Sequence, residues 1–407
     1  MSENPLRFIK NRKEEIISNL RNLIAAKTEN PPGNTTPAIE TIASILDKYS
    51  ISYEIVEPEK GKKNLIAEVG KGDALILNGH VDVVPAGQGW DFDPFKGEII
   101  NGRIYGRGAT DMKSGVIALL YAFIYHREIK KGKLILSIVA DEETGAKYGT
   151  KYLLNEGLID GIACIIAEPT GSLPRRGYNI VAGERGVLWA KIKSKGKAGH
   201  GSLPMLGENA IKEISKLITL LPEIVPGDIS IPEEAKDLII NGKEVLEKKH
   251  PKAPYALDHY TINVGVIKGG KKVNAIPDEA EIEIDMRVPI GSSSDQALKT
   301  LESIVPGWYE IEVKDTIEPS FTPSSNLLVE SLRSTAKMIL NYDPKPIAMA
   351  ATTDARLFRY KGIPTVNFGP GYLEVAHARN EFVYLQDVLD FTVIYIKFIE
   401  NFFSHSP

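Results

Sequence analysis

The chain has 407 residues and a single cysteine, Cys164. One cysteine excludes a disulfide within the chain, so we expect a cytoplasmic protein. Cys164 lies in the apolar run 162–166, which predicts a buried strand residue rather than a reactive thiol. No apolar run approaches the roughly 18 residues that a membrane span needs. The first ten residues also lack the long apolar core of a secretory signal.

The chain also has little excess charge of either sign, because its formal net charge is only -4. This balance argues against a nucleic-acid partner and against an acidic tail. Hydrophobic residues make up 43% and charged residues 25% of the chain, which is typical of a soluble globular protein. No internal repeat and no low-complexity segment is present. With a prior of about 150 residues per domain, the length predicts two or three domains.

Predicted strands and helices alternate up to about residue 172. Apolar runs that read as strands are followed by segments with apolar residues at helical spacing. The predicted strands are 53–57, 64–69, 74–84, 133–140 and 162–167, and the predicted helices are 6–26, 38–48, 112–126 and 148–155. This order favours an α/β layer with a largely parallel sheet.

The pattern changes near Gly183. Residues 187–194, 260–267 and 280–288 alternate between apolar and polar, as half-buried strands do. Predicted helices at 209–221 and 294–304 accompany them, and a proline-rich insertion at 222–255 has some helix. After Thr316 the first pattern resumes, with helices at 326–340, 355–360 and 385–402 and a strand at 364–368. We therefore expect a doubly wound α/β domain with a mixed sheet (1–182 and 317–407), interrupted by a smaller two-layer α/β domain (183–316).

Metal-competent side chains recur where predicted strands end. They are His80 and Asp82, Asp111, Glu142 and Glu143, Glu168, and the late His377. Ligands of an open α/β sheet bind at the carboxyl ends of its strands, so these groups are expected to face one crevice. Histidines and carboxylates without a thiolate suit zinc, cobalt or manganese.

Charge favours two ions, because three ligand carboxylates and a bridging hydroxide balance two divalent cations. Of the neighbours Glu142 and Glu143, one would then bind a metal while the other acts as a base on the water. Asp82 lies two residues after His80, on the same side of an extended chain. It is placed to hold the imidazole in the tautomer that binds metal.

The motifs that surround these residues resemble the dizinc aminoacylase and exopeptidase family. They are Gly79-His-Val-Asp-Val-Val-Pro85, Gly106-Arg-Gly-Ala-Thr-Asp-Met-Lys-Ser-Gly115, Asp141-Glu-Glu-Thr-Gly145, Gly183-Glu-Arg-Gly186, Gly199-His-Gly-Ser202, Asn274-Ala-Ile-Pro277, Asp285-Met-Arg287 and Thr353-Asp-Ala-Arg356. That family includes acetylornithine deacetylase, succinyl-diaminopimelate desuccinylase, aminoacylases and glutamate carboxypeptidases. The resemblance runs from about residue 10 to the C-terminus.

The resemblance implies a role for each matching residue. His80, Asp111 and Glu168 would bind one zinc ion. Asp111, Glu143 and His377 would bind the other, with Asp111 as the bridge. Glu142 would be the general base, and Asp82 would orient His80.

His200 resembles a histidine that, in this family, stabilises the tetrahedral oxyanion, often from the partner subunit of a dimer. On its own it would be interpreted as a loop histidine. Asn274 resembles a polar contact to substrate or oxyanion. Arg287 resembles the clamp for the substrate's α-carboxylate; the alternative for Arg287 is a structural pair with Asp285.

Two further positions are candidates for substrate binding. Arg356 is a second possible contact for a carboxylate. Gly371, at the end of 369–371, would let the backbone approach a ligand closely. The resemblance also implies a homodimer that forms through the inserted domain.

The sequence therefore predicts a metal-dependent hydrolase of an amide bond next to a free carboxylate, with two divalent ions and an N-acyl amino acid as substrate. A metallocarboxypeptidase or dipeptidase that acts on short or N-blocked peptides is the main alternative. A two-metal phosphoesterase would need a phosphate-binding basic cluster or P-loop, and the chain has neither. The intact set of ligands and Glu142 argue against a non-catalytic binding protein.

Overall fold

The computed structural model describes residues 3–173 and 177–405. The chain divides into two compact units. The first unit consists of Met1–Ala182, Thr322–Pro346 and Thr353–Pro407, and the second of Gly183–Phe321 and Ile347–Thr352. Within the described residues, no helix is both long enough and apolar enough to cross a membrane.

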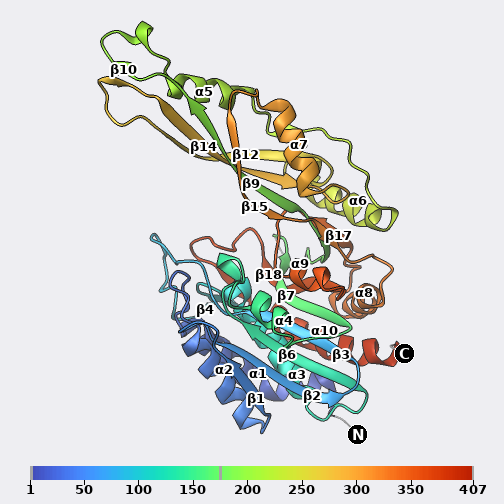
Figure 1. Cartoon of the computed structure of the whole chain (residues 1–407). Helices are drawn as coiled ribbons and strands as arrows, with labels where there is room; N and C mark the ends of the chain where they lie inside the picture. The colour runs from blue at the N-terminus through green and yellow to red at the C-terminus, as the bar shows by residue number, and fades with distance from the viewer. Residues whose placement is uncertain (1–2, 174–176, 406–407) are drawn as a thin grey trace. The chain divides into compact units, whose positions relative to one another are not determined.

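The first unit is built on a mixed sheet (Figure 1). The sheet has nine strands in the order β1-β2-β6-β3-β7-β18-β8-β16, and β17 pairs with β8. Of these, β16 and residues 347–349 of β17 are assigned to the second unit. The strands are β1 Tyr53–Val56, β2 Asn64–Lys71, β3 Ala74–His80, β6 Gly132–Val139, β7 Ala163–Gly171, β8 Ile180–Glu184, β16 Ser320–Phe321, β17 Pro346–Met349 and β18 Thr365–Tyr372. The central strands β6, β3, β7 and β18 run parallel, whereas β1, β2, β8 and β16 pair antiparallel with their neighbours.

Strand β3 lies at the centre of this sheet. All seven of its residues are buried, which accounts for its continuous apolar run. It pairs in parallel with β6 on one side and β7 on the other. The predicted strand 74–84 ends at His80, because the chain leaves the sheet there.

Helices complete the first unit. They are α1 Pro5–Ala25, α2 Thr36–Lys48, α3 Ser114–Tyr125, α4 Thr150–Asn155, α8 Leu327–Leu340, α9 Ala355–Tyr360 and α10 Leu385–His405. Asn4 caps α1 by accepting the backbone N–H groups of Leu6 and Arg7. The predicted helix 112–126 begins two residues later, at Ser114, because Asp111 and Met112 have non-helical backbone angles.

The sequence did not predict the small antiparallel sheet of the first unit. Its strands are β4 Glu98–Ile100, β5 Arg103–Tyr105 and β19 Phe382–Tyr384. Each strand has three residues, which is too short for a periodic pattern to be read. The sheet joins the segment before Asp111 to the segment after His377.

The second unit has a five-stranded antiparallel sheet in the order β11-β12-β14-β9-β15. Its strands are β9 Gly186–Lys195, β11 Ile224–Val225, β12 Tyr260–Gly269, β14 Glu279–Val288 and β15 Glu310–Ile317, with β10 Gly199–His200 and β13 Ala275–Ile276 as a separate pair. Its helices are α5 Ala210–Leu220, α6 Glu233–Glu247 and α7 Ser294–Ile304.

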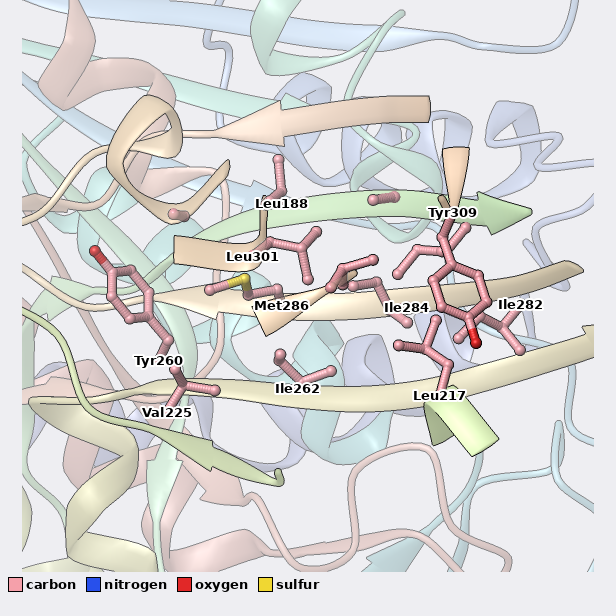
Figure 2. Packing of buried hydrophobic residues seen from close by; sticks show 14 of the residues in the cluster. Leu188, Leu217, Val225, Tyr260, Ile262, Ile282, Ile284, Met286, Leu301 and Tyr309 are labelled. Atoms are coloured by element: carbon pink, nitrogen blue, oxygen red, sulfur yellow. The ribbon is translucent and has the colours of Figure 1, made fainter. Parts of the chain in front are cut away.

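The core of the second unit lies on one face of this sheet. Figure 2 shows side chains such as Leu188, Ile262, Ile284 and Met286 packed together with Leu217 and Leu301. Along β14, buried residues alternate with more exposed ones. The predicted alternation of residues 280–288 is therefore confirmed.

The boundary of the second unit differs from the predicted end at residue 316. The unit continues to Phe321 because β16 pairs with Gly183 and Glu184. It also takes in Ile347–Thr352, where the Thr352 hydroxyl donates to the backbone oxygen of Arg185 at 2.9 Å. These contacts join segments that are far apart in the sequence, which periodicity cannot reveal.

Candidate metal centre and active site

The candidate site residues of the first unit lie where parallel strands end. His80 is the last residue of β3, and it pairs in register with Val139 at the end of β6. The turn with Glu142 and Glu143 follows β6, and Glu168 lies in β7 beside β3. The carboxyl ends of these strands share one edge of the sheet, so the structure brings the predicted residues together.

Asp111 lies between two groups of side chains. Its Oδ1 is 3.2 Å from His80 Nε2, which is also 3.4 Å from Glu168 Oε1. Its Oδ2 is 3.2 Å from His377 Nε2, which in turn is 3.2 Å from Glu143 Oε1. Asp111 thus offers one oxygen to each of two three-residue groups whose ligand atoms converge.

The spacing of these atoms fits metal coordination better than direct ion pairs. Charge-assisted N–H to carboxylate hydrogen bonds are usually about 2.7–2.9 Å long. Two ligands of a tetrahedral ion with bonds of about 2.0 Å lie about 3.3 Å apart. The separations of 3.2–3.4 Å match the second value. The donor set of nitrogen and oxygen atoms suits zinc, cobalt or manganese.

The electrostatics of the cluster also favour cations. Hydrogen bonds with Asp111 and Glu143 raise the pKa of His377 to about 10, although burial opposes this shift. Burial raises the pKa of Glu168 to about 7, and the Asp111 carboxylate adds to that rise. Three carboxylates held close together therefore create a strong negative potential in this part of the sheet edge.

Glu142 lies beside the cluster but belongs to neither group of ligands. Burial raises the pKa of its carboxyl well above the usual range, with further contributions from Glu168, Asp354 and Glu143. His80 acts in the opposite direction. A carboxylate with a raised pKa next to a candidate metal pair is suited to accept a proton.

Comparison with known proteins decides the family. The model of peptidase family M20/M25/M40 matches residues 76–401. The chain belongs to this family.

Two curated relatives of this M20 chain carry desuccinylase names. A Staphylococcus aureus (strain MSSA476) protein named "Probable succinyl-diaminopimelate desuccinylase" is 29% identical, with 96% of each chain covered. A Nautilia profundicola protein named "Succinyl-diaminopimelate desuccinylase" is 31% identical, with 90% of this chain and 96% of the relative covered. The M20 chain is a hydrolase of a metal-dependent family, and the predicted family is confirmed.

Solved structures of M20 proteins share the fold. An M20 metallo-carboxypeptidase, Sso-CP2 from Sulfolobus solfataricus, aligns with a TM-score of 0.79 at 22% identity, covering 96% of this chain and 99% of that one. The YXEP protein of Bacillus subtilis, described as a dinuclear metal-binding peptidase, aligns with a TM-score of 0.64 at 16% identity, covering 96% and 99%. The predicted fold class is confirmed.

Asp82 contacts His80 through both its main chain and its carboxylate. The Nδ1 atom of His80 is 3.0 Å from the main-chain oxygen of Asp82 and 3.5 Å from its carboxylate. The Asp82 carboxylate also accepts the backbone N–H groups of Glu142 at 3.2 Å and Glu143 at 3.3 Å. The main chain and the carboxylate of Asp82 thus both contact the imidazole, and the carboxylate also holds the Glu142–Glu143 turn.

Sequence reasoning missed Glu381 and Arg107. Glu381 is fully buried and accepts the backbone N–H groups of Gly108, Thr110 and Asp111 at 3.1, 2.8 and 3.0 Å. Arg107 donates to Glu381 at 2.5 Å and to the backbone oxygen of His377 at 3.1 Å. The pair ties the two loops of the cluster together. The one available signal was the position of Glu381 four residues after His377.

Gly371 and Arg356 are the other candidates of the first unit. Gly371 has a φ of +111°, and a Cβ there would lie 3.0–3.1 Å from atoms of Thr110. It therefore allows close packing next to Asp111. Arg356 is half-buried, and its guanidinium donates to the backbone oxygen of Thr353.

The remaining candidates belong to the second unit. The backbone N–H of Gly201 donates to the backbone oxygen of Asn274 at 2.8 Å, so His200 and Asn274 lie at the same end of that unit. His200 Nδ1 is 3.2 Å from the backbone N–H of Ser202 and 2.7 Å from the hydroxyl of the same residue. Arg287 forms an ion pair with Asp285, with an Nε to Oδ1 distance of 2.9 Å.

Proposed function

We propose that this M20 chain is a dimetal amidohydrolase that removes the acyl group from an N-acyl amino acid with a free carboxylate. The observation that carries the proposal is the position of Asp111, with one oxygen toward His80 and the other toward His377. The desuccinylase names of its relatives support a short dicarboxylic acyl group such as succinyl.

The proposed ligands form two sets that share Asp111. His80, Asp111 and Glu168 would hold one divalent ion, and Asp111, Glu143 and His377 the other. Zinc is the expected metal, with cobalt or manganese as substitutes. When bound, the ions would polarise the substrate carbonyl and lower the pKa of the attacking water.

Glu142 performs the proton transfers in this proposal. Its carboxylate accepts a proton from the water as the water oxygen bonds to the amide carbon. As the C–N bond breaks, the carboxyl returns that proton to the leaving amine. The position of Glu142 next to His80, Glu168 and Glu143 supports this role.

Residues of the second unit are proposed to recognise the substrate. His200 would donate from Nε2 to the developing oxyanion, and Asn274 would assist it. Arg287 would bind the α-carboxylate of the substrate through its planar guanidinium, and its ion pair with Asp285 would break when the substrate binds. In the first unit, Arg356 would contact a second carboxylate, and Gly371 would support the loop beside Asp111. We expect the protein to work as a homodimer that forms through its second unit.

A carboxypeptidase or dipeptidase is the second candidate function. Its specific support is the similarity of the fold to that of a metallo-carboxypeptidase. The same ligands and the same base would serve that reaction, so the acceptable acyl group separates the two functions.

The test is turnover of a substrate panel by the zinc- or cobalt-loaded protein. The panel contains N-succinyl-diaminopimelate, N-acetyl-ornithine, N-acyl hydrophobic amino acids, N-blocked dipeptides and free dipeptides. Cleavage confined to one short acyl group supports the deacylase. Cleavage of dipeptides supports the peptidase, and a protein that binds no metal refutes both.

The variant Glu142→Gln separates the roles of the two neighbouring glutamates. We expect it to lose about 10²–10⁴-fold in kcat while it keeps the metal content of the wild type. The exposed Glu14→Gln is the matched control and should leave both quantities unchanged. Loss of metal from Glu142→Gln would contradict its role as the base.

A further inference from the structure

A buried polar network lies behind the Glu142–Glu143 turn. Lys62 Nζ donates to Asp141 Oδ1 at 3.0 Å and to Asn30 Oδ1 at 3.2 Å. Asn30 Nδ2 donates to Asp82 Oδ2 at 2.8 Å. All four residues are at most 9% exposed, so the network is shielded from water. Interactions between charges are stronger in such surroundings than at the surface.

Lys62 determines how the Asn30 amide points. An ammonium group only donates, so it must face the Asn30 carbonyl oxygen. The amide nitrogen is thereby directed toward Asp82, Asp141 and Thr144, which are 2.8, 3.2 and 3.0 Å away. The loop of Gly33 is folded tightly over this contact, because a Cβ there would lie 2.1 Å from Lys62 Nζ.

Asp141 connects Lys62 to the turn. Its backbone has a φ of +72°, a left-handed conformation that residues other than glycine rarely adopt. Its carboxylate accepts the Thr144 hydroxyl at 2.7 Å and the Tyr148 N–H at 3.3 Å, which holds the chain in this conformation. Lys62 supplies the positive charge that this buried carboxylate needs.

Asp82 connects Asn30 to the same turn. As described above, its carboxylate receives the backbone N–H groups of both Glu142 and Glu143. The turn is thus held at its start by Asp141 and along its backbone by Asp82. Lys62 donates to Asp141 and to the Asn30 oxygen. Asn30 in turn donates to both Asp82 and Asp141.

We infer that Lys62 and Asn30 are positioning residues that hold the Glu142–Glu143 turn in the geometry required for catalysis and for one of the two metal sites. The inference rests on the proposed roles of Glu142 and Glu143. It has an asymmetric consequence, because Glu143 belongs to the group of Asp111 and His377 but not to that of His80 and Glu168. Loss of the network should weaken one metal site and spare the other.

The test compares Lys62→Met with Lys63→Met. Lys63 is the adjacent lysine, and its Nζ is 4.0 Å from Glu40, outside the network. Zinc titration calorimetry of the apo protein should show one site within about twofold of wild type and the other weakened about 10–100-fold in Lys62→Met. The kcat should fall by a similar factor with KM within about twofold, because the turn carries the base rather than substrate contacts. Lys63→Met should match wild type.

Two milder variants keep the test decisive if Lys62→Met does not fold. Asn30→Ala and Thr144→Val each remove one part of the network and leave Lys62 paired with Asp141. Both should also weaken a single zinc site. Hydrogen exchange of the segment 142–148 in the apo protein should become faster in each variant, since the backbone of the turn is less well held.

Equal weakening of both zinc sites, or wild-type zinc binding and kcat in Asn30→Ala and Thr144→Val, would overturn the inference. Failure of the proposed function looks different, because the wild-type protein itself would then bind fewer than two zinc ions. In that case the exchange rates of the segment 142–148 still decide whether Lys62 and Asn30 hold the turn.

Discussion

The carboxylate of Glu381 accepts the backbone N–H of Asp111 at 3.0 Å, although the two residues are 270 positions apart in the sequence. Glu381 also pairs with the buried guanidinium of Arg107. One carboxylate therefore fixes the backbone of the residue that both candidate metal groups share. The position of Asp111 depends on a residue that contributes no ligand atom.

Glu381→Gln should destabilise the protein. The change leaves the buried Arg107 without an anionic partner, which costs about 3–5 kcal/mol in comparable sites. Denaturant unfolding followed by circular dichroism measures the free energy of unfolding. The double variant Arg107→Met with Glu381→Gln should lose less than the sum of the losses of Arg107→Met and Glu381→Gln alone. A strictly additive double variant would show that the pair is not coupled.

Replacement of single ligands should reveal the shared role of Asp111. Glu168→Ala and Glu143→Ala each remove a ligand from one group only, so each should reduce bound zinc from two ions to one per chain. Asp111→Ala removes a ligand from both groups and should leave less than one ion. Metal analysis after dialysis provides the measurement. Retention of one full ion by Asp111→Ala would argue against a bridging aspartate.

Arg287→Met should impair binding of the substrate carboxylate. Loss of charge-assisted hydrogen bonds of about 1.5–3 kcal/mol predicts a decrease of about 10–150-fold in kcat/KM. Asp285→Asn keeps the guanidinium and frees it from its partner, so it is the matched control and should keep most of the activity. Wild-type kinetics in Arg287→Met would contradict the prediction. If Arg287→Met and Asp285→Asn then also lose the same amount of stability, the ion pair has only a structural role.

The stability of the protein should fall at acidic pH through His126. Burial lowers the pKa of this histidine to about 4, against a usual value of 6.5, and its bond to the Ile396 carbonyl only partly opposes the shift. Between these pH values the unfolded chain binds a proton that the folded protein does not bind. The stabilisation is therefore complete above pH 6.5 and is lost as the pH falls toward 4, by about 3 kcal/mol.

Unfolding of His126→Gln across this pH range checks the prediction. The glutamine keeps a donor for Ile396 but cannot titrate, so the stability difference between wild type and variant should change by about the same amount between pH 7 and pH 4. His250→Gln, at an exposed position, is the control. A difference that does not vary with pH would exclude His126 as the source.

The sequence by itself determined most of the elements and the candidate ligands. Continuous apolar runs such as Ala74–His80 predict buried parallel strands, because such strands are covered on both faces. The ends of those strands then predict where His80, Glu143 and Glu168 meet. The two-residue alternation of β14 predicts a sheet with one buried face. These features are local, so their physical cause is visible in short stretches of sequence.

Only the tertiary structure decided how the site is supported. Glu381 contacts Asp111, Lys62 contacts Asp141, and Asn30 contacts Asp82, all across long stretches of chain. Nothing in the residues around Lys62 or Asn30 marks them as buried, since lysine and asparagine are usually exposed. Their burial follows from the folded arrangement, in which each finds a charged or polar partner that repays its loss of water. The candidate ligands were therefore predictable from the sequence, and the network that holds them was not.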